Sequence, residues 1–158
     1  MDVKPIKPNP ITFGCYKHIL KTLFKKGQIP TVTHGIYGRR LSKRNISAEH
    51  LLPKSLGGDL SLGNIALADR DINAVRGNKP LADFLSWKKL EAYLQQFNFR
   101  IAGVFDGFKY QKLIRETCAN LGVQPPADVA EQLAKEQLSK KLLRSMRNKT
   151  KKGLDIVV

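Results

Sequence analysis

The chain has 158 residues with a net charge of +15, and 42% of them are hydrophobic. This composition is typical of one ordinary globular domain with a core of its own. No apolar run approaches the ~20 residues that span a bilayer, and two cysteines are too few for a disulfide framework. The first ten residues lack the apolar segment of a secretory signal, so we expect a cytoplasmic protein that is neither secreted nor membrane-bound.

The positive charge is concentrated in two flanks of the sequence. Residues 1–48 hold ten Lys or Arg against Asp2, and residues 135–152 hold eight against Glu136. Residues 49–134 hold ten basic and ten acidic residues. Flanks of this kind attract a polyanion and bind it through phosphate contacts. Nucleic acid is therefore the expected partner. The two less favoured explanations of the charge are basic helix faces that only keep the protein soluble and binding to an anionic membrane surface.

The first predicted element is an amphipathic helix over residues 11–26. Asn9-Pro10 has the residue types of an N-cap and a first helical position, apolar residues follow at steps of four, and Gly27 ends the helix. Residues 29–48 are rich in glycine and β-branched residues, which predicts loop and a short strand.

Residues 45–78 predict a strand, a loop, a second strand and a helix. NISAEHLLP is short, alternates in part and ends at a proline, and KSLGGDLSLG is rich in turn residues, with Gly57-Gly58 at the bend. NIALA is short and apolar, as a second strand would be. DRDINAVRGN predicts a helix with Asp69 or Asp71 as its cap and with Ile72 and Val75 facing inward.

Three more helices are expected, at about residues 80–97, 106–121 and 126–148. The last is amphipathic and strongly basic, and Pro125-Pro126 separates it from the preceding residues. The predicted fold is α+β and mostly helical. We expect a domain over residues 1–124, with a strand–loop–strand–helix unit at about 44–80, and a basic C-terminal helix and tail over 125–158.

The segment from 49 to 80 contains a series of polar residues and glycines in a fixed order: Glu49-His50, Pro53, Ser55, Gly57-Gly58, Asn64, Asn73 and Arg76-Gly77-Asn78-Lys79. These positions resemble the HNH endonuclease motif, whose fold is the ββα-metal finger. The first asparagine of the motif, Asn64, lies fourteen positions after His50, and the second, Asn73, lies nine positions further on. The resemblance covers about 32 of the 158 residues.

The chemistry of phosphodiester hydrolysis gives each of these residues an expected role. His50 is suited to taking a proton from water near neutral pH, as a general base. By the resemblance, Glu49 and Asn73 bind one Mg²⁺ or Mn²⁺ ion, a donor set of oxygens that these ions accept, and Asn64 fastens the loop. The ion stabilises the leaving 3′ oxygen. Arg76, one turn beyond Asn73, is expected to clamp the scissile phosphate.

The sequence departs from the family pattern in two ways. The acid before His50 is Glu where most HNH proteins have Asp, and the paired CxxC motifs that hold a structural zinc in many of them are absent. No structural zinc is therefore expected. The residues expected to contact nucleic acid are Arg39, Arg40, Lys43, Arg44, Lys54, Lys79, Lys140, Lys141, Arg144 and Arg147.

Three functions compete at this stage. The first is a metal-dependent HNH endonuclease that nicks or cuts DNA, with RNA not excluded, as a monomer or a homodimer. The second is a non-catalytic nucleic-acid-binding protein that keeps the finger as a scaffold. The third, a regulatory protein whose basic helix binds an acidic partner, does not explain residues 49–80.

Overall fold

The computed structural model describes residues 15–153, with the side chains of residues 19–148. Residue contacts divide the chain into two compact units, Met1–Gln124 and Pro125–Val158. The fold is mixed α+β and mostly helical, as the sequence predicts. None of the helices in this described part is both long and apolar enough to cross a membrane.

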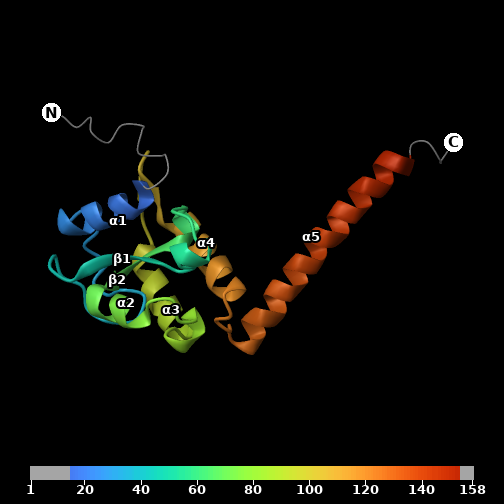
Figure 1. The fold of residues 1–158 in the computed structure, drawn as a ribbon. Helices are drawn as coiled ribbons and strands as arrows, with labels where there is room; N and C mark the ends of the chain where they lie inside the picture. Colours follow the sequence, from blue (N-terminus) through green and yellow to red (C-terminus); the bar gives the residue numbers. More distant parts are fainter. Residues whose placement is uncertain (1–14, 154–158) are drawn as a thin grey trace. The chain divides into compact units, whose positions relative to one another are not determined.

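The centre of the first unit is an antiparallel ribbon of two strands. β1 (Ile46–His50) pairs with β2 (Ile65–Asp69), with His50 opposite Ile65 and Ile46 opposite Asp69. Both predicted strands are confirmed. All five residues of β2 are buried, because α1 (Cys15–Lys25) and α2 (Arg70–Arg76) both contact the ribbon and lie on opposite sides of it (Figure 1).

The outer edge of β2 is covered without a third strand. The Ile36 N–H donates to Leu67 O (2.8 Å), and the hydroxyls of two buried tyrosines supply further partners. Tyr93 Oη accepts from Leu67 N–H (3.0 Å), and Tyr110 Oη donates to Ile65 O (2.7 Å). These contacts satisfy backbone groups that an open strand edge would leave unpaired.

Helices, 3₁₀ turns and a short hairpin complete the first unit. α3 (Trp87–Leu94) and α4 (Gly107–Asn120) carry the two tyrosines, which pack in an aromatic cluster with phenylalanines of the chain between them. α4 contacts the turn that precedes β2. The remaining elements are η3 (Lys54–Leu56), η4 (Leu62–Asn64), η5 (Leu81–Asp83), η6 (Gln95–Phe97), β3 (Arg100–Ile101) and β4 (Phe105–Asp106).

Two predictions, on the helix at 80–97 and on Val75, are wrong, and a third falls on residues that the structure does not describe. The single helix expected at 80–97 is broken, because Ser86 caps a new helix by accepting from Lys89 N–H (3.2 Å). We expected Val75 to face inward, but it is 57% exposed, and the neighbouring Arg76 is buried instead. The predicted N-cap at Asn9-Pro10 lies outside the described residues, as does the tail beyond residue 153.

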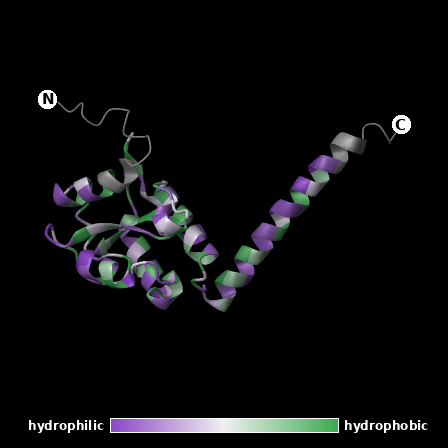
Figure 2. Cartoon of the chain, in the orientation of Figure 1, coloured by the Kyte–Doolittle hydropathy of each residue, from purple (hydrophilic) through white to green (hydrophobic). Residues whose placement is uncertain are grey.

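The second unit consists of one long helix, α5 (Ala127–Gly153), as predicted for this region. Nearly all of its described side chains beyond residue 130 are exposed, including Leu138 and Leu142. Hydrophilic residues with interspersed apolar ones run along its length (Figure 2). Its stability therefore depends on local helix propensity and ion pairs such as Lys135–Glu131 (3.3 Å) more than on a core.

The bend at Gly57-Gly58 yields a stability prediction, because the two glycines are required for different reasons. Gly57 has φ 98°, a left-handed conformation, and a Cβ there would meet no other atom. A Cβ on Gly58 would overlap the carbonyl of Leu52. Gly57→Ala should cost about 1 kcal/mol and Gly58→Ala about 3 kcal/mol or more, measured by urea unfolding. Equal losses would contradict the close approach at Gly58.

Candidate functional site

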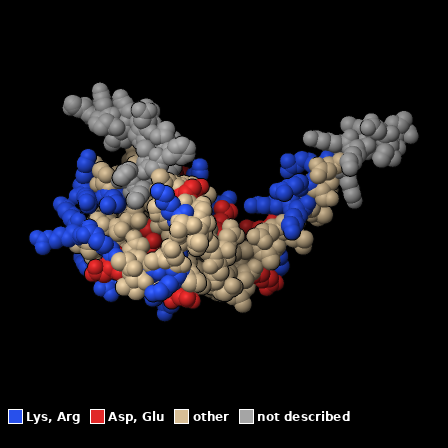
Figure 3. Space-filling model, in the orientation of Figure 1, with Lys and Arg blue, Asp and Glu red and all other residues tan. Residues whose placement is uncertain are grey.

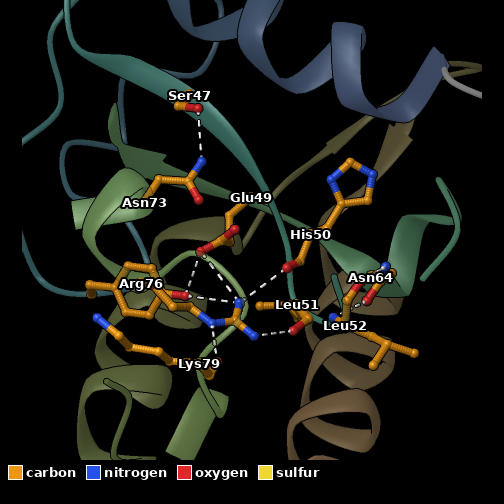
Figure 4. Close-up of polar contacts among 10 residues, drawn as sticks. Ser47, Glu49, His50, Leu51, Leu52, Asn64, Asn73, Arg76 and Lys79 are labelled. Atoms are coloured by element: carbon orange, nitrogen blue, oxygen red, sulfur yellow. Dashed lines mark hydrogen bonds and ion pairs between the residues drawn. The ribbon is translucent and has the colours of Figure 1, made fainter. Parts of the chain in front are cut away.

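The candidate site lies where the end of β1 meets α2. α2 follows β2 without a loop, and Asp69 caps it by accepting from Asp71 N–H (2.6 Å), so Asp69 is the cap. The short connection brings the inner face of α2 against the last residues of β1. Glu49, Asn73 and Arg76 gather there, from two elements that are separated in sequence by the loop of residues 51–64 and by β2 (Figure 4).

Glu49 is a buried carboxylate, 5% exposed. Its Oε2 accepts from Tyr37 Oη (2.7 Å) and lies 3.4 Å from Arg76 Nη1. Burial raises the pKa of the Glu49 carboxyl above its usual value, while the Tyr37 hydrogen bond and the Arg76 charge oppose that rise. The same burial, together with the Glu49 charge, raises the pKa of the Tyr37 phenol. The phenol therefore keeps its proton and acts as a donor.

Asn73 lies with its amide between Ser47 and Glu49. The end nearest Glu49 is 2.5 Å from Oε1 and 3.0 Å from Oε2, and the other end is 3.0 Å from Ser47 Oγ. With nitrogen toward Glu49, the amide donates to both carboxylate oxygens and accepts from Ser47. With oxygen toward Glu49, two acceptors face one another, which only a proton or a cation between them would stabilise.

The second amide orientation suits a hard divalent cation. Mg²⁺ and Mn²⁺ prefer oxygen ligands, and Mg²⁺ in particular keeps several water or phosphate oxygens beside one or two protein groups. Among the described residues, no cluster of three or more His, Cys, Asp and Glu side chains could hold a metal. The oxygens that the structure brings together here for a cation are those of the Glu49 carboxylate and the Asn73 amide.

The expected role of Arg76 as a phosphate clamp is wrong in this structure. Its side chain is 2% exposed, and its donors are used inside the protein. Nη2 donates to Leu51 O (2.8 Å), Nη1 to His50 O (3.1 Å) and Nε to Lys79 O (3.0 Å). A guanidinium held by three backbone carbonyls and a buried carboxylate is a structural group that joins the end of α2 to the end of β1.

His50 is partly buried at the last position of β1. Its imidazole points to the other side of the strand from the Glu49 carboxylate (Figure 4), as strand alternation dictates for neighbouring residues. The structure thus brings Glu49, Asn73 and Arg76 together but directs His50 away from them. Groups on the two sides of β1 could act on one molecule only if it lay across the end of the strand.

Asn64 fastens the loop between the strands. Its Oδ1 accepts from Leu52 N–H (2.8 Å), and its Nδ2 donates to Leu52 O (3.1 Å) and Asp59 O (2.9 Å). The side chain is buried, and its backbone carbonyl accepts from Leu51 N–H (2.9 Å). These bonds hold the chain just after His50, which is the fastening contact that the resemblance led us to expect.

The basic residues expected to contact nucleic acid are exposed in the described structure. Side chains of this kind gather at the edge formed by α1 and the loop before β1 (Figure 3). Within that loop, Arg39 pairs with Asp69 (3.3 Å), and Asn45 braces the backbone by donating to Arg40 O (3.0 Å). Exposed members of the expected set are Arg40, Lys43, Arg44, Lys54 and Lys79 in the first unit, and Lys140, Lys141, Arg144 and Arg147 in the second.

Two members of the cluster, Tyr37 and Ser47, were not predicted from the sequence. Ser47 lies two residues before Glu49 on the same strand, so the period of two was a usable signal that they share a face. Tyr37 had a weaker signal, since it lies in a segment that predicts loop. A tyrosine between apolar residues and glycines is nevertheless a candidate for burial, and a buried hydroxyl needs a partner.

Comparisons with known proteins add no relative. No protein-family model, no curated protein and no solved structure matches the chain.

The structural role of Arg76 can be tested by removing its charge. Arg76→Leu leaves Glu49 buried without its cation and strips three carbonyls of a donor, so it should lower the free energy of unfolding by about 3–5 kcal/mol. The matched control is Arg39→Leu, which removes a half-exposed partner of Asp69 and should cost at most about 1 kcal/mol. Chemical denaturation of both variants measures the loss in the free energy of unfolding. Equal losses would contradict the structural role assigned to Arg76.

Proposed function

We propose that this chain is a metal-dependent endonuclease of the HNH kind that hydrolyses phosphodiester bonds of DNA. The observation that carries the proposal is the meeting of Glu49 from β1 with Asn73 from α2, with the amide 2.5 Å from Oε1. The motif names these two residues as metal ligands, although 24 positions separate them in the sequence. The antiparallel β1–β2 pair followed directly by α2 gives further support.

The chain's own residues would divide the chemistry as follows. His50 takes the proton from the attacking water, because imidazole exchanges protons near neutral pH. Asn64 holds the backbone that follows His50, and Arg76 holds the carbonyls of residues 50 and 51. Mg²⁺ or Mn²⁺, bound by Glu49 and Asn73, would supply positive charge to the phosphate and to the leaving 3′ oxygen.

The charge distribution supports DNA as the substrate. The exposed basic loop before β1 and the basic α5 flank a middle segment of balanced charge. Phosphate contacts from such flanks bind without reading sequence, and RNA is the other polyanion that they would accept. The proposal places this activity in the cytoplasm, on DNA, where one finger per chain nicks as a monomer and cuts both strands as a homodimer.

Plasmid nicking with purified protein tests the proposal. The wild-type chain should convert supercoiled DNA to the open circle with Mg²⁺ or Mn²⁺, and EDTA should abolish this. His50→Ala should lower the rate by about 10²–10⁴-fold, the usual contribution of a general base, whereas His34→Ala should not. If the wild-type protein cuts neither DNA nor RNA with any of the metals and at any pH tested, the proposed enzymatic function is wrong. If it binds DNA in a salt-sensitive way without cutting it, a non-catalytic DNA-binding protein is favoured.

The basic loop before β1 can be tested separately through the salt dependence of DNA binding. Replacing Arg40, Lys43 and Arg44 together by alanine should reduce the slope of log K against log salt by about 1 for each lost phosphate contact. The matched control replaces three exposed lysines of α3 and α4, Lys88, Lys89 and Lys112, and should change the slope less. Equal changes would mean that only net charge matters.

A further inference from the structure

Tyr37 occupies a rigid place beside the candidate metal ligands. Its loop is closed by the His34–Arg40 bridge, with Gly35 N–H donating to Arg39 O (2.9 Å). The Ile36 N–H ties the same loop to the edge of β2. The Tyr37 side chain is 6% exposed, and its ring packs edge-on against Phe84. The hydroxyl is therefore fixed relative to β1.

The two oxygens of Glu49 have different neighbours. Oε2 accepts a hydrogen bond from Tyr37 Oη (2.7 Å), and Arg76 Nη1 is 3.4 Å from both of these oxygen atoms. Oε1 is the oxygen closest to the Asn73 amide, at 2.5 Å. The protein thus holds one carboxylate oxygen with two donors and turns the other toward Asn73.

We propose that Tyr37 is a positioning residue of the metal site, which occupies Oε2 of Glu49 and leaves Oε1 as the carboxylate oxygen that binds the cation beside Asn73. This inference rests on the proposed function, because it assigns the cation to Glu49 and Asn73. It adds a residue that lies outside the segment 49–80 and that touches neither substrate nor metal.

Arg76 by itself does not provide this positioning. Its Nη2 and Nε are committed to the carbonyls of Leu51 and Lys79, and its Nη1 is shared among three acceptors. Without the Tyr37 hydroxyl, the carboxylate would be free to turn toward the guanidinium and away from Asn73. Partners that orient a ligand in this way commonly contribute 10–100-fold to metal affinity.

The test is a Mn²⁺ titration of the full-length chain without DNA, followed by electron paramagnetic resonance. Tyr37→Phe keeps the ring and removes only the hydroxyl, and it should weaken Mn²⁺ binding on the order of 10-fold. The matched control is Tyr110→Phe, which removes a fully buried hydroxyl that donates to Ile65 O (2.7 Å). It should leave Mn²⁺ affinity unchanged, although both variants lower Tm.

Nicking assays give a second measurement. For Tyr37→Phe, the Mn²⁺ concentration at half-maximal rate should rise on the order of 10-fold, while the rate at saturating Mn²⁺ stays within about 2-fold of wild type, because the base and ligands remain.

The outcomes separate this inference from the proposed function. If the wild-type protein binds Mn²⁺ and nicks DNA, and Tyr37→Phe binds Mn²⁺ equally well, the proposed role of Tyr37 is wrong but the proposed endonuclease function is unaffected. Wild type that neither binds Mn²⁺ nor nicks overturns the proposed function. A Tyr37→Phe chain that fails to fold while Tyr110→Phe folds would assign Tyr37 to stability, and would also overturn the inference.

Discussion

The buried guanidinium of Arg76 is the interaction on which the candidate site depends. It ties the end of α2 to the end of β1 through the carbonyls of His50 and Leu51, and it balances the charge of Glu49. Neither charge would be tolerated alone at this depth, since a buried ion without a partner is strongly destabilising. Glu49 and Arg76 are therefore buried together, and each makes the other possible.

This pairing has a consequence for the chemistry proposed at the site. A carboxylate that already accepts from Tyr37 and faces Arg76 is well oriented, but part of its charge is neutralised before any cation arrives. Burial, which raises the pKa of Glu49, acts in the same direction by disfavouring its ionised form. If the proposed cation binds here, these donors would give the site a fixed geometry and a modest metal affinity, with phosphate oxygens completing the shell.

Local sequence patterns predicted the elements of the site well and its packing less well. The run NIALA and the turn residues around Gly57-Gly58 identified β2 and the loop, and Asn64 was recognised through its spacing. The prediction that Val75 faces inward was wrong. Helical periodicity alone favours burial of the apolar residue, whereas the buried Glu49 carboxylate requires the Arg76 guanidinium beside it. The hairpin of β3 and β4 was missed, since two-residue strands leave almost no periodic signal.

The sequence by itself determined the order of β1, β2 and α2, the helical character of the rest and the two basic flanks, because period, capping and charge are local properties. Only the tertiary structure decided that Tyr37 and Arg76 both contact the Glu49 carboxylate. Tyr37 is twelve residues before Glu49 and Arg76 is twenty-seven after it, and no local rule relates them. Their meeting follows from a buried carboxylate, whose desolvation must be offset by donors from wherever the chain can supply them.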